Sequence, residues 1–235
     1  MRWPIASFLC ATLTVALGCE REPHELPPSP TEDDTSNMND RRELESADAL
    51  SQRANIALSN RRYADAVRYA QQALEIRERR LAFDDFELGK SYWDLAVALH
   101  ACNRDADAIE RLRRAIAVLE SGRFTDGPPF ASCLSLLAEC YGTTGNVEEA
   151  ESLFERAIPL FENHGGEQNG DIVQVYAQTL SGLGMCYLAR SRFDRAEEMF
   201  QRALAIQRAH LGENHADVAT TLDRMRVLQR KRENR

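Results

Sequence analysis

From about residue 46 onward, the chain repeats one pattern of apolar and small positions. Four stretches that superimpose on one another each contain an anchoring alanine, at intervals of 42, 42 and 46 residues. These anchors are Ala66, Ala108, Ala150 and Ala196. An apolar residue follows each anchor after four positions and an alanine after seven, and a small residue precedes it by twelve. Since positions four and seven apart share one face of an α-helix, each repeat predicts two amphipathic helices joined by a short polar turn.

The repeat length predicts a stack rather than separate hairpins. One helix pair cannot bury its apolar face alone, so neighbouring pairs must pack together. We expect four hairpins over about 46–88, 89–130, 131–176 and 177–213, closed by a polar helix over 214–232. The four extra residues of the last interval fall in a glycine-rich loop at 165–170, where insertions are tolerated. Pro159 should kink or end its helix, and Asn214 and Asp217 suit the start of the last one.

This pattern resembles the tetratricopeptide repeat, in the form of about 42 residues found in kinesin light chains and many bacterial proteins. The stretch 203–222 is the most similar, although Ala216 stands where proline is usual and Arg53 occupies a normally apolar position. HEAT and armadillo repeats have similar periods, but their small positions fit less well. The resemblance implies an all-α, right-handed α-solenoid whose first helices line a concave face that binds peptides or partner helices.

Carried over position by position, the resemblance implies a mixed and mostly uncharged groove. It would be lined by Asn55, Leu58, Lys90, Trp93, Val97, His100, Ser132, Ser135, Glu139, Gln178, Ser181, Met185 and Leu188. This set lacks the Lys/Arg clamp with which tetratricopeptide co-chaperones hold a C-terminal carboxylate. Trp93 is the best candidate for a dominant contact, because aromatic residues often carry binding energy; packing beneath the preceding loop is the alternative.

The first 18 residues are typical of a signal peptide. Arg2 precedes the uncharged stretch 5–17, which as a helix would span about 20 Å and is too short for a hydrocarbon core of about 30 Å. The run at 15–19, V-A-L-G-C, resembles a bacterial lipobox, with Ala16 where Leu or Val is usual. We expect cleavage before Cys19 and lipidation of its thiol. Ordinary secretion with an unmodified Cys19 is the alternative.

Residues 19–45 are expected to form a disordered, acidic, proline-rich tether. They carry nine acidic residues and three arginines. They contain too few apolar groups for burial to offset the conformational entropy that is lost on ordering. The net charge of −8 for the whole chain argues against nucleic-acid binding. Residues 224–235 are basic, with a net charge of +5. A solvated cap is the simpler interpretation, and a patch for anionic lipid or an acidic partner is the other.

No catalytic motif stands out, and we expect no enzyme activity, cofactor or metal site. There is no H-E-x-x-H, C-x-x-C, Walker loop or G-x-S-x-G, and the five histidines lack metal-ligand spacing. Cys133 and Cys140 lie seven residues apart on one expected helix, a rise of about 10.5 Å that excludes a strain-free disulfide. Cys140 and Cys186 are equivalent in successive repeats, and a bridge between them is the alternative to two buried thiols.

These observations favour a non-catalytic scaffold or adaptor that binds a protein or peptide. The resemblance to lipoproteins places it in a bacterial cell envelope, exported and held to a membrane by a lipid anchor, on the periplasmic side or the surface. The alternatives are a soluble exported protein, a small-ligand-binding or regulatory solenoid, and a structural protein that self-associates through its ends.

Overall fold

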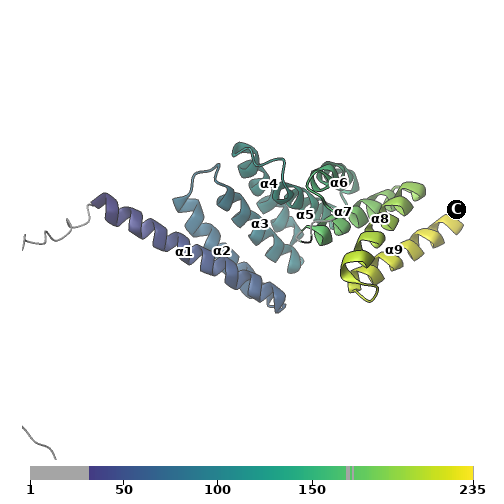
Figure 1. Cartoon of the computed structure of the whole chain (residues 1–235), viewed down its shortest axis with the longest axis horizontal. Coiled ribbons are helices and arrows are strands. Elements are labelled where there is room, and N and C mark those ends of the chain that lie inside the picture. Colours follow the sequence, from purple (N-terminus) through teal and green to yellow (C-terminus); the bar gives the residue numbers. More distant parts are fainter. Residues whose placement is uncertain (1–31, 168–169, 171, 235) are drawn as a thin grey trace, which may run out of the picture.

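Helices alone make up the regular structure of the described residues in this computed structural model, which describes residues 32–167, 170 and 172–234. Figure 1 shows them as a stack of hairpins. The nine helices are α1 (Glu32–Ser59), α2 (Tyr63–Arg80), α3 (Phe86–Ala101), α4 (Asp105–Ser121), α5 (Pro128–Thr143), α6 (Val147–Glu162), α7 (Val173–Ala189), α8 (Phe193–Leu211) and α9 (Ala216–Glu233). The expected all-α helical-repeat solenoid is therefore confirmed.

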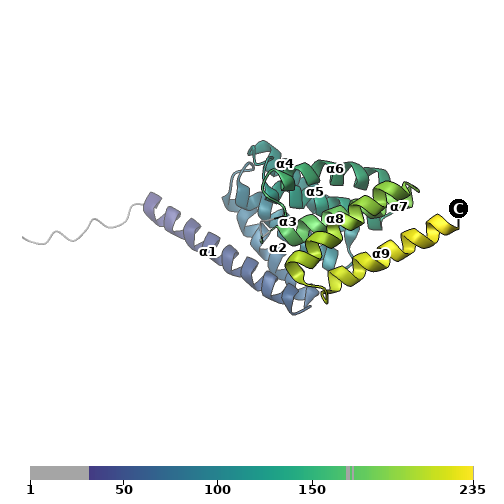
Figure 2. The same cartoon turned by 45° about the vertical axis from the view of Figure 1, so that its right-hand side comes forward.

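The two helices of each hairpin play different parts in the stack. Each helix packs on the next along the chain, and first helices also contact one another, α1 with α3, α3 with α5, α5 with α7 and α7 with α9. Within the described residues, successive second helices make no such contacts. First helices therefore approach more closely than second helices, which places them on the inner side of the curved stack, with α1 and α9 at its ends (Figure 2).

The repeated alanines lie where the hairpins close. All four anchors are fully buried, and so are the alanines seven residues further along. Small side chains at these positions let two helix backbones approach, while larger side chains fill the remaining space: Phe154 packs near Gly182 of the next hairpin and Phe200 near Gly184 of its own. The expected roles of the repeat positions in the core are confirmed.

One turn conformation joins the helices of every hairpin. The equivalent residues Arg61, Asn103, Gly145 and Ser191 all have positive φ, between 57° and 88°. The amide of the residue after each of them donates to a carbonyl five residues back, as in Arg62 to Ala57 O at 2.8 Å. This is the hydrogen bond of a Schellman helix end, and it turns the chain sharply enough for the second helix to pack on the first.

The first helix is longer than expected. α1 begins at Glu32, so residues 32–45, which we expected to belong to a disordered tether, are helical. Part of this extension pairs with α2: Arg80 contacts Asp40 at 2.7 Å and donates to both carboxylate oxygens of Glu43. Composition alone gave no sign of these partners. The signal peptide, Cys19 and the remainder of the tether lie outside the described residues.

Helix ends also differ from the expected limits. α3, α5 and α7 begin three or four residues early, because the limits were inferred from interior packing positions rather than from caps such as Asp85. Pro159 does not end α6, which continues to Glu162. The residue that caps α9 is His215, whose Nδ1 accepts from the amide of Asp217 at 3.2 Å, and not Asn214.

None of the helices in the described part of the chain has both the length and the apolarity that a membrane-spanning helix requires.

Candidate functional site

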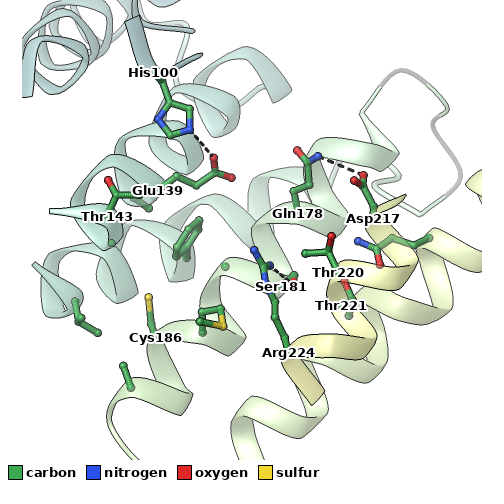
Figure 3. A pocket seen from close by; sticks show the side chains of 18 residues that line it. His100, Glu139, Thr143, Gln178, Ser181, Cys186, Asp217, Thr220, Thr221 and Arg224 are labelled. Atoms are coloured by element: carbon green, nitrogen blue, oxygen red, sulfur yellow. Dashed lines mark hydrogen bonds and ion pairs between the residues drawn. The ribbon is translucent and has the colours of Figure 1, made fainter. Parts of the chain in front are cut away.

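A hollow of about 560 Å³ opens on the inner side of the stack, between α3, α5, α7 and α9 (Figure 3). We call it the inner groove. Its walls come mostly from first helices, with Val147 and Phe154 from α6 and Gln207 from α8 at its floor. It lies where the resemblance implied a concave binding face.

Five of the expected groove residues line the inner groove. They are His100, Glu139, Gln178, Ser181 and Met185. Three others, Lys90, Trp93 and Ser132, line a second hollow of about 300 Å³ beside the first turns of α3 and α5. Val97 lies half-buried on the same face of α3 as Trp93 and His100. One face of α3 thus runs from one hollow to the other.

The remaining expected residues do not line either hollow. Leu188 is only 2% exposed and belongs to the apolar core, so its assignment to the groove was wrong. Ser135 is buried as well, where it donates to Ala131 O and accepts from Thr179 Oγ1 at 2.9 Å. Ser135 and Leu188 were expected in the groove because of their family positions. The close packing of α5 and α7 buries them instead. Asn55 and Leu58 lie on α1, outside both hollows.

Arg224 was not among the expected groove residues. It was counted with the basic tail, but α9 directs it into the inner groove, where its Nη1 donates to Ser181 Oγ at 2.6 Å (Figure 3). Burial lowers the pKa of Arg224, while the charges of Glu139 and Asp217 act in the opposite direction. Only the contact between α7 and α9 reveals this cation, since its spacing in the sequence matches no groove position.

Two carboxylates and two amides complete the polar lining. Burial raises the pKa of Glu139, although His100 and Arg224 lower it in part. Asp217 accepts from Gln178 Nε2 at 3.4 Å. The buried amide of Gln207 has an Oε1 with no hydrogen-bond partner among the described residues. The inner groove therefore offers positive, negative and neutral hydrogen-bonding groups within one hollow.

The second hollow is largely apolar. Phe86, Pro128, Pro129 and Ile172 contribute to its lining together with Trp93. Trp93 packs partly against the core, and its indole Nε1 is buried without a hydrogen-bond partner in the described part of the chain. Buried indole N–H groups usually have a partner, and this one has none among the described residues.

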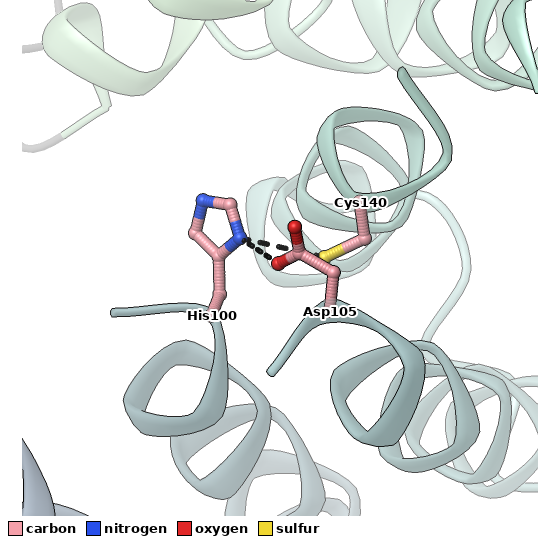
Figure 4. A group of neighbouring side chains, drawn as sticks. All are labelled: His100, Asp105 and Cys140. Carbon is pink, nitrogen blue, oxygen red and sulfur yellow. Dashed lines mark hydrogen bonds and ion pairs between the residues drawn. The ribbon is translucent and has the colours of Figure 1, made fainter. Parts of the chain in front are cut away.

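A histidine, an aspartate and a cysteine form the one group of at least three possible metal ligands found among the described residues (Figure 4). The Nδ1 atom of His100 lies 2.6 Å from Asp105 Oδ1 and 3.7 Å from Cys140 Sγ. The ligand atoms of the three residues all lie within 4.8 Å of one another. Cys140 and Cys186 are both buried free thiols.

Comparison with protein families identifies the repeat. The tetratricopeptide repeat pattern matches residues 45–121 and 175–233, more than half of the chain, and a second tetratricopeptide repeat pattern matches residues 130–164. An Arabidopsis thaliana protein, KINESIN LIGHT CHAIN-RELATED 3, is 31% identical over 88 residues, which are 37% of this chain. The matched part is 12% of that relative's length.

Solved structures share the fold. A putative kinesin light chain of Podosopora anserina with nearly identical TPR-like repeats has a TM-score of 0.62 at 21% identity, covering 79% of this chain and 88% of the other. BtubC (BKLC) from P. vanneervenii has a TM-score of 0.63 at 22% identity, covering 85% and 84%. A Rap protein complexed with competence and sporulation factor has a TM-score of 0.60 at 19% identity, covering 80% and 54%. With its buried small-residue anchors, its repeated turn and these matches, the chain belongs to the tetratricopeptide repeat family.

Proposed function

We propose that the chain is a non-catalytic adaptor that binds a segment of a partner protein in the inner groove. The observation that carries this proposal is the hollow of about 560 Å³ on the side of the first helices. Its size suits a few residues of an extended chain or one face of a short helix. The fold is shared with a Rap protein that was solved with a bound factor, which supports this use of the fold.

The lining indicates what kind of segment would bind. Arg224 supports an acidic side chain or a terminal carboxylate. Met185 is 40% exposed and presents a flexible apolar surface in the same groove. We therefore propose a ligand segment that combines one carboxylate with apolar residues.

The second hollow provides an anchoring contact in this proposal. Trp93 would cover an apolar side chain of the same ligand. Because Lys90, Trp93, Val97 and His100 share one face of α3, a segment running along that face reaches both hollows.

Export and lipid anchoring form a separate part of the proposal. They rest on the signal-like stretch 1–18 and the lipobox-like run that ends at Cys19. Intact mass of the protein purified from its native membrane fraction tests them. Acyl mass on a chain beginning at Cys19 would support an anchored adaptor, a free Cys19 would indicate a secreted one, and an uncleaved Met1 would contradict export.

Selection from a displayed library of short random peptides tests the groove. Thr220 and Ala219 are exposed neighbours on α9, but only Thr220 lines the inner groove. We expect the full chain to enrich a family of related peptides, Thr220→Trp to lose them, and Ala219→Trp to keep them. Failure to enrich any family, or equal loss in both variants, would contradict the proposal.

The alternatives predict different results in the same material. A small-ligand-binding or regulatory solenoid would enrich no peptides. Its melting temperature would instead rise when a metabolite from a screened collection binds. Self-association through the ends would give a molar mass by light scattering that rises with concentration. An enzyme would require turnover in the groove that Arg224→Ala abolishes.

A further inference from the structure

The His100, Asp105 and Cys140 side chains come from three helices and converge at the junction of the second and third hairpins (Figure 4). His100 lies in the last turn of α3, Asp105 begins α4, and Cys140 lies near the end of α5. All three are wholly or partly buried. Nitrogen, carboxylate oxygen and thiolate sulfur together are donors that suit zinc.

The geometry argues against a catalytic cysteine–histidine pair. A catalytic thiol must be open to its substrate, whereas Cys140 is fully buried. Here a single nitrogen, Nδ1 of His100, faces both the Asp105 oxygen and the Cys140 sulfur. Three donor atoms that converge on one point are arranged as ligands for one ion.

We propose that His100 Nδ1, Asp105 and Cys140 Sγ bind one Zn²⁺ ion, with a water molecule from the inner groove as the fourth ligand. Zinc–ligand distances of about 2.0–2.3 Å place tetrahedral N and S ligands about 3.6 Å apart, close to the 3.7 Å between His100 Nδ1 and Cys140 Sγ. The 2.6 Å contact between His100 and Asp105 would open to about 3.3 Å around the ion. This requires a small rotation of two partly exposed side chains.

Neighbouring groups already support the proposed ligands. Thr143 Oγ1 donates to the second oxygen of Asp105 at 2.6 Å. Glu139 Oε2 lies 3.8 Å from the far ring nitrogen of His100, Nε2. A carboxylate behind a ligating histidine and a donor behind a ligating carboxylate are the usual outer partners of a metal site.

The repeat itself does not require this cluster. The positions equivalent to His100 and Asp105 in the next repeat are Gly142 and Val147, while Cys186 is equivalent to Cys140. That junction packs without a histidine or an aspartate there. The three donors are therefore particular to the second and third hairpins, and Cys186 provides a matched control.

Binding must release one proton. Burial, followed by the charges of Asp105 and Glu139, raises the pKa of Cys140 to about 12, so the metal-free thiol keeps its proton at neutral pH. The reaction is Cys140–SH plus Zn²⁺ giving the Zn²⁺-bound thiolate plus H⁺, with no change of oxidation state.

Titration of the reduced, metal-free full chain with Co²⁺, followed by displacement with Zn²⁺, tests the site. We expect one equivalent of Co²⁺ to produce a thiolate-to-metal charge-transfer band that Zn²⁺ removes. Cys140→Ser should abolish the band and Cys186→Ser should retain it. Glu139→Gln should weaken Zn²⁺ binding by about 10–100-fold, and His100→Ala at least as much.

The controls keep the result decisive if one variant misfolds. His100 is partly exposed, so His100→Ala remains informative even where Cys140→Ser loses its helical circular dichroism. Absence of saturable binding, a band that survives both His100→Ala and Cys140→Ser, or equal loss in Cys186→Ser would overturn the proposal. Peptide selection by the inner groove is measured separately in metal-free buffer, so the two proposals can fail independently.

Discussion

A Cβ atom added to Gly184 would lie 2.6 Å from Cε1 of Phe200, closer than side chains can pack. Gly184 occupies the small position of α7, where the three preceding hairpins carry alanine. Phe200 is fully buried in α8 and fills the space that an alanine methyl group would need. The size of one side chain therefore determines the size of its partner on the neighbouring helix.

Replacing this glycine should destabilise the fourth hairpin. We expect Gly184→Ala to cost about 1–3 kcal/mol through overpacking, despite the better helix propensity of alanine. Gly142 of α5 is the control, because an added Cβ there meets nothing within 4 Å. Gly142→Ala should stabilise by up to about 1 kcal/mol. Chemical denaturation monitored by circular dichroism distinguishes them, and equal effects would contradict this account.

The buried guanidinium of Arg77 should hold the first hairpin to the second. Arg77 is 2% exposed, and its Nη1 donates to Ser51 of α1 at 3.0 Å and to Ser91 of α3 at 2.6 Å. Arg77→Ala removes charged hydrogen bonds and leaves a gap, so we expect a loss of about 2–3 kcal/mol. The exposed Arg79→Ala should change stability by about 0.5 kcal/mol or less.

Hydrogen exchange locates the effect of this change. Faster exchange in α1 and α2 of Arg77→Ala, with α7 and α8 unchanged, is the expected pattern, since each hairpin contacts only its neighbours. Uniformly faster exchange across all hairpins would show that Arg77 does not act locally.

Asp94 should make stability depend on pH. Burial raises its pKa, although Lys90 and Arg77 lower it in part, and its Oδ2 has no hydrogen-bond partner among the described residues. Between the unfolded and folded pKa values, the native state holds more protons, so this residue lowers stability as pH rises. Asp94→Asn should therefore be more stable at neutral pH, by about 1 kcal/mol.

The difference from wild type should shrink as the pH is lowered through the folded-state pKa of Asp94. Urea denaturation of both proteins across the acidic range measures it. A difference that stays constant with pH would show that the carboxylate charge is not the cause.

Local spacing was enough to predict the repeat because each hairpin packs by contacts close in sequence. The anchors such as Ala108, the turn at Asn103 and the close approach at Gly184 all follow from intervals within one or two repeats. The start of α1 was missed, and the residue that pairs with its Asp40 and Glu43 is Arg80, about 40 residues away along the chain.

The candidate sites were harder to predict for the same reason. Arg224 faces Ser181 only after α9 packs on α7, and His100 meets Cys140 only after α5 packs on α3. Five of the residues that family positions implied line the inner groove, but the same positions also included the buried Leu188. Spacing along one helix indicates a face, whereas exposure depends on how closely the next helix packs.

Arg224 should contribute to ligand binding through its charge. We expect Arg224→Ala to weaken the affinity for a selected acidic peptide by about tenfold or more, because the variant loses one hydrogen bond between charged groups. Arg226, on the same helix, is exposed, pairs with Asp223 and does not line the groove, so Arg226→Ala should bind normally. Fluorescence anisotropy measures both affinities. A selected peptide that binds both variants equally well would mean that Arg224 has no part in recognition.

The central claim is that ligands bind on the side of the first helices, and photo-crosslinking tests it most directly. A selected peptide carrying a photoreactive side chain would be crosslinked to the full chain and the attachment sites mapped by mass spectrometry. Crosslinks on α5, α7 and α9, at residues such as Gln178, Met185 and Thr220, are the predicted result. Crosslinks confined to residues of α4, α6 and α8 that do not line the inner groove would contradict the account.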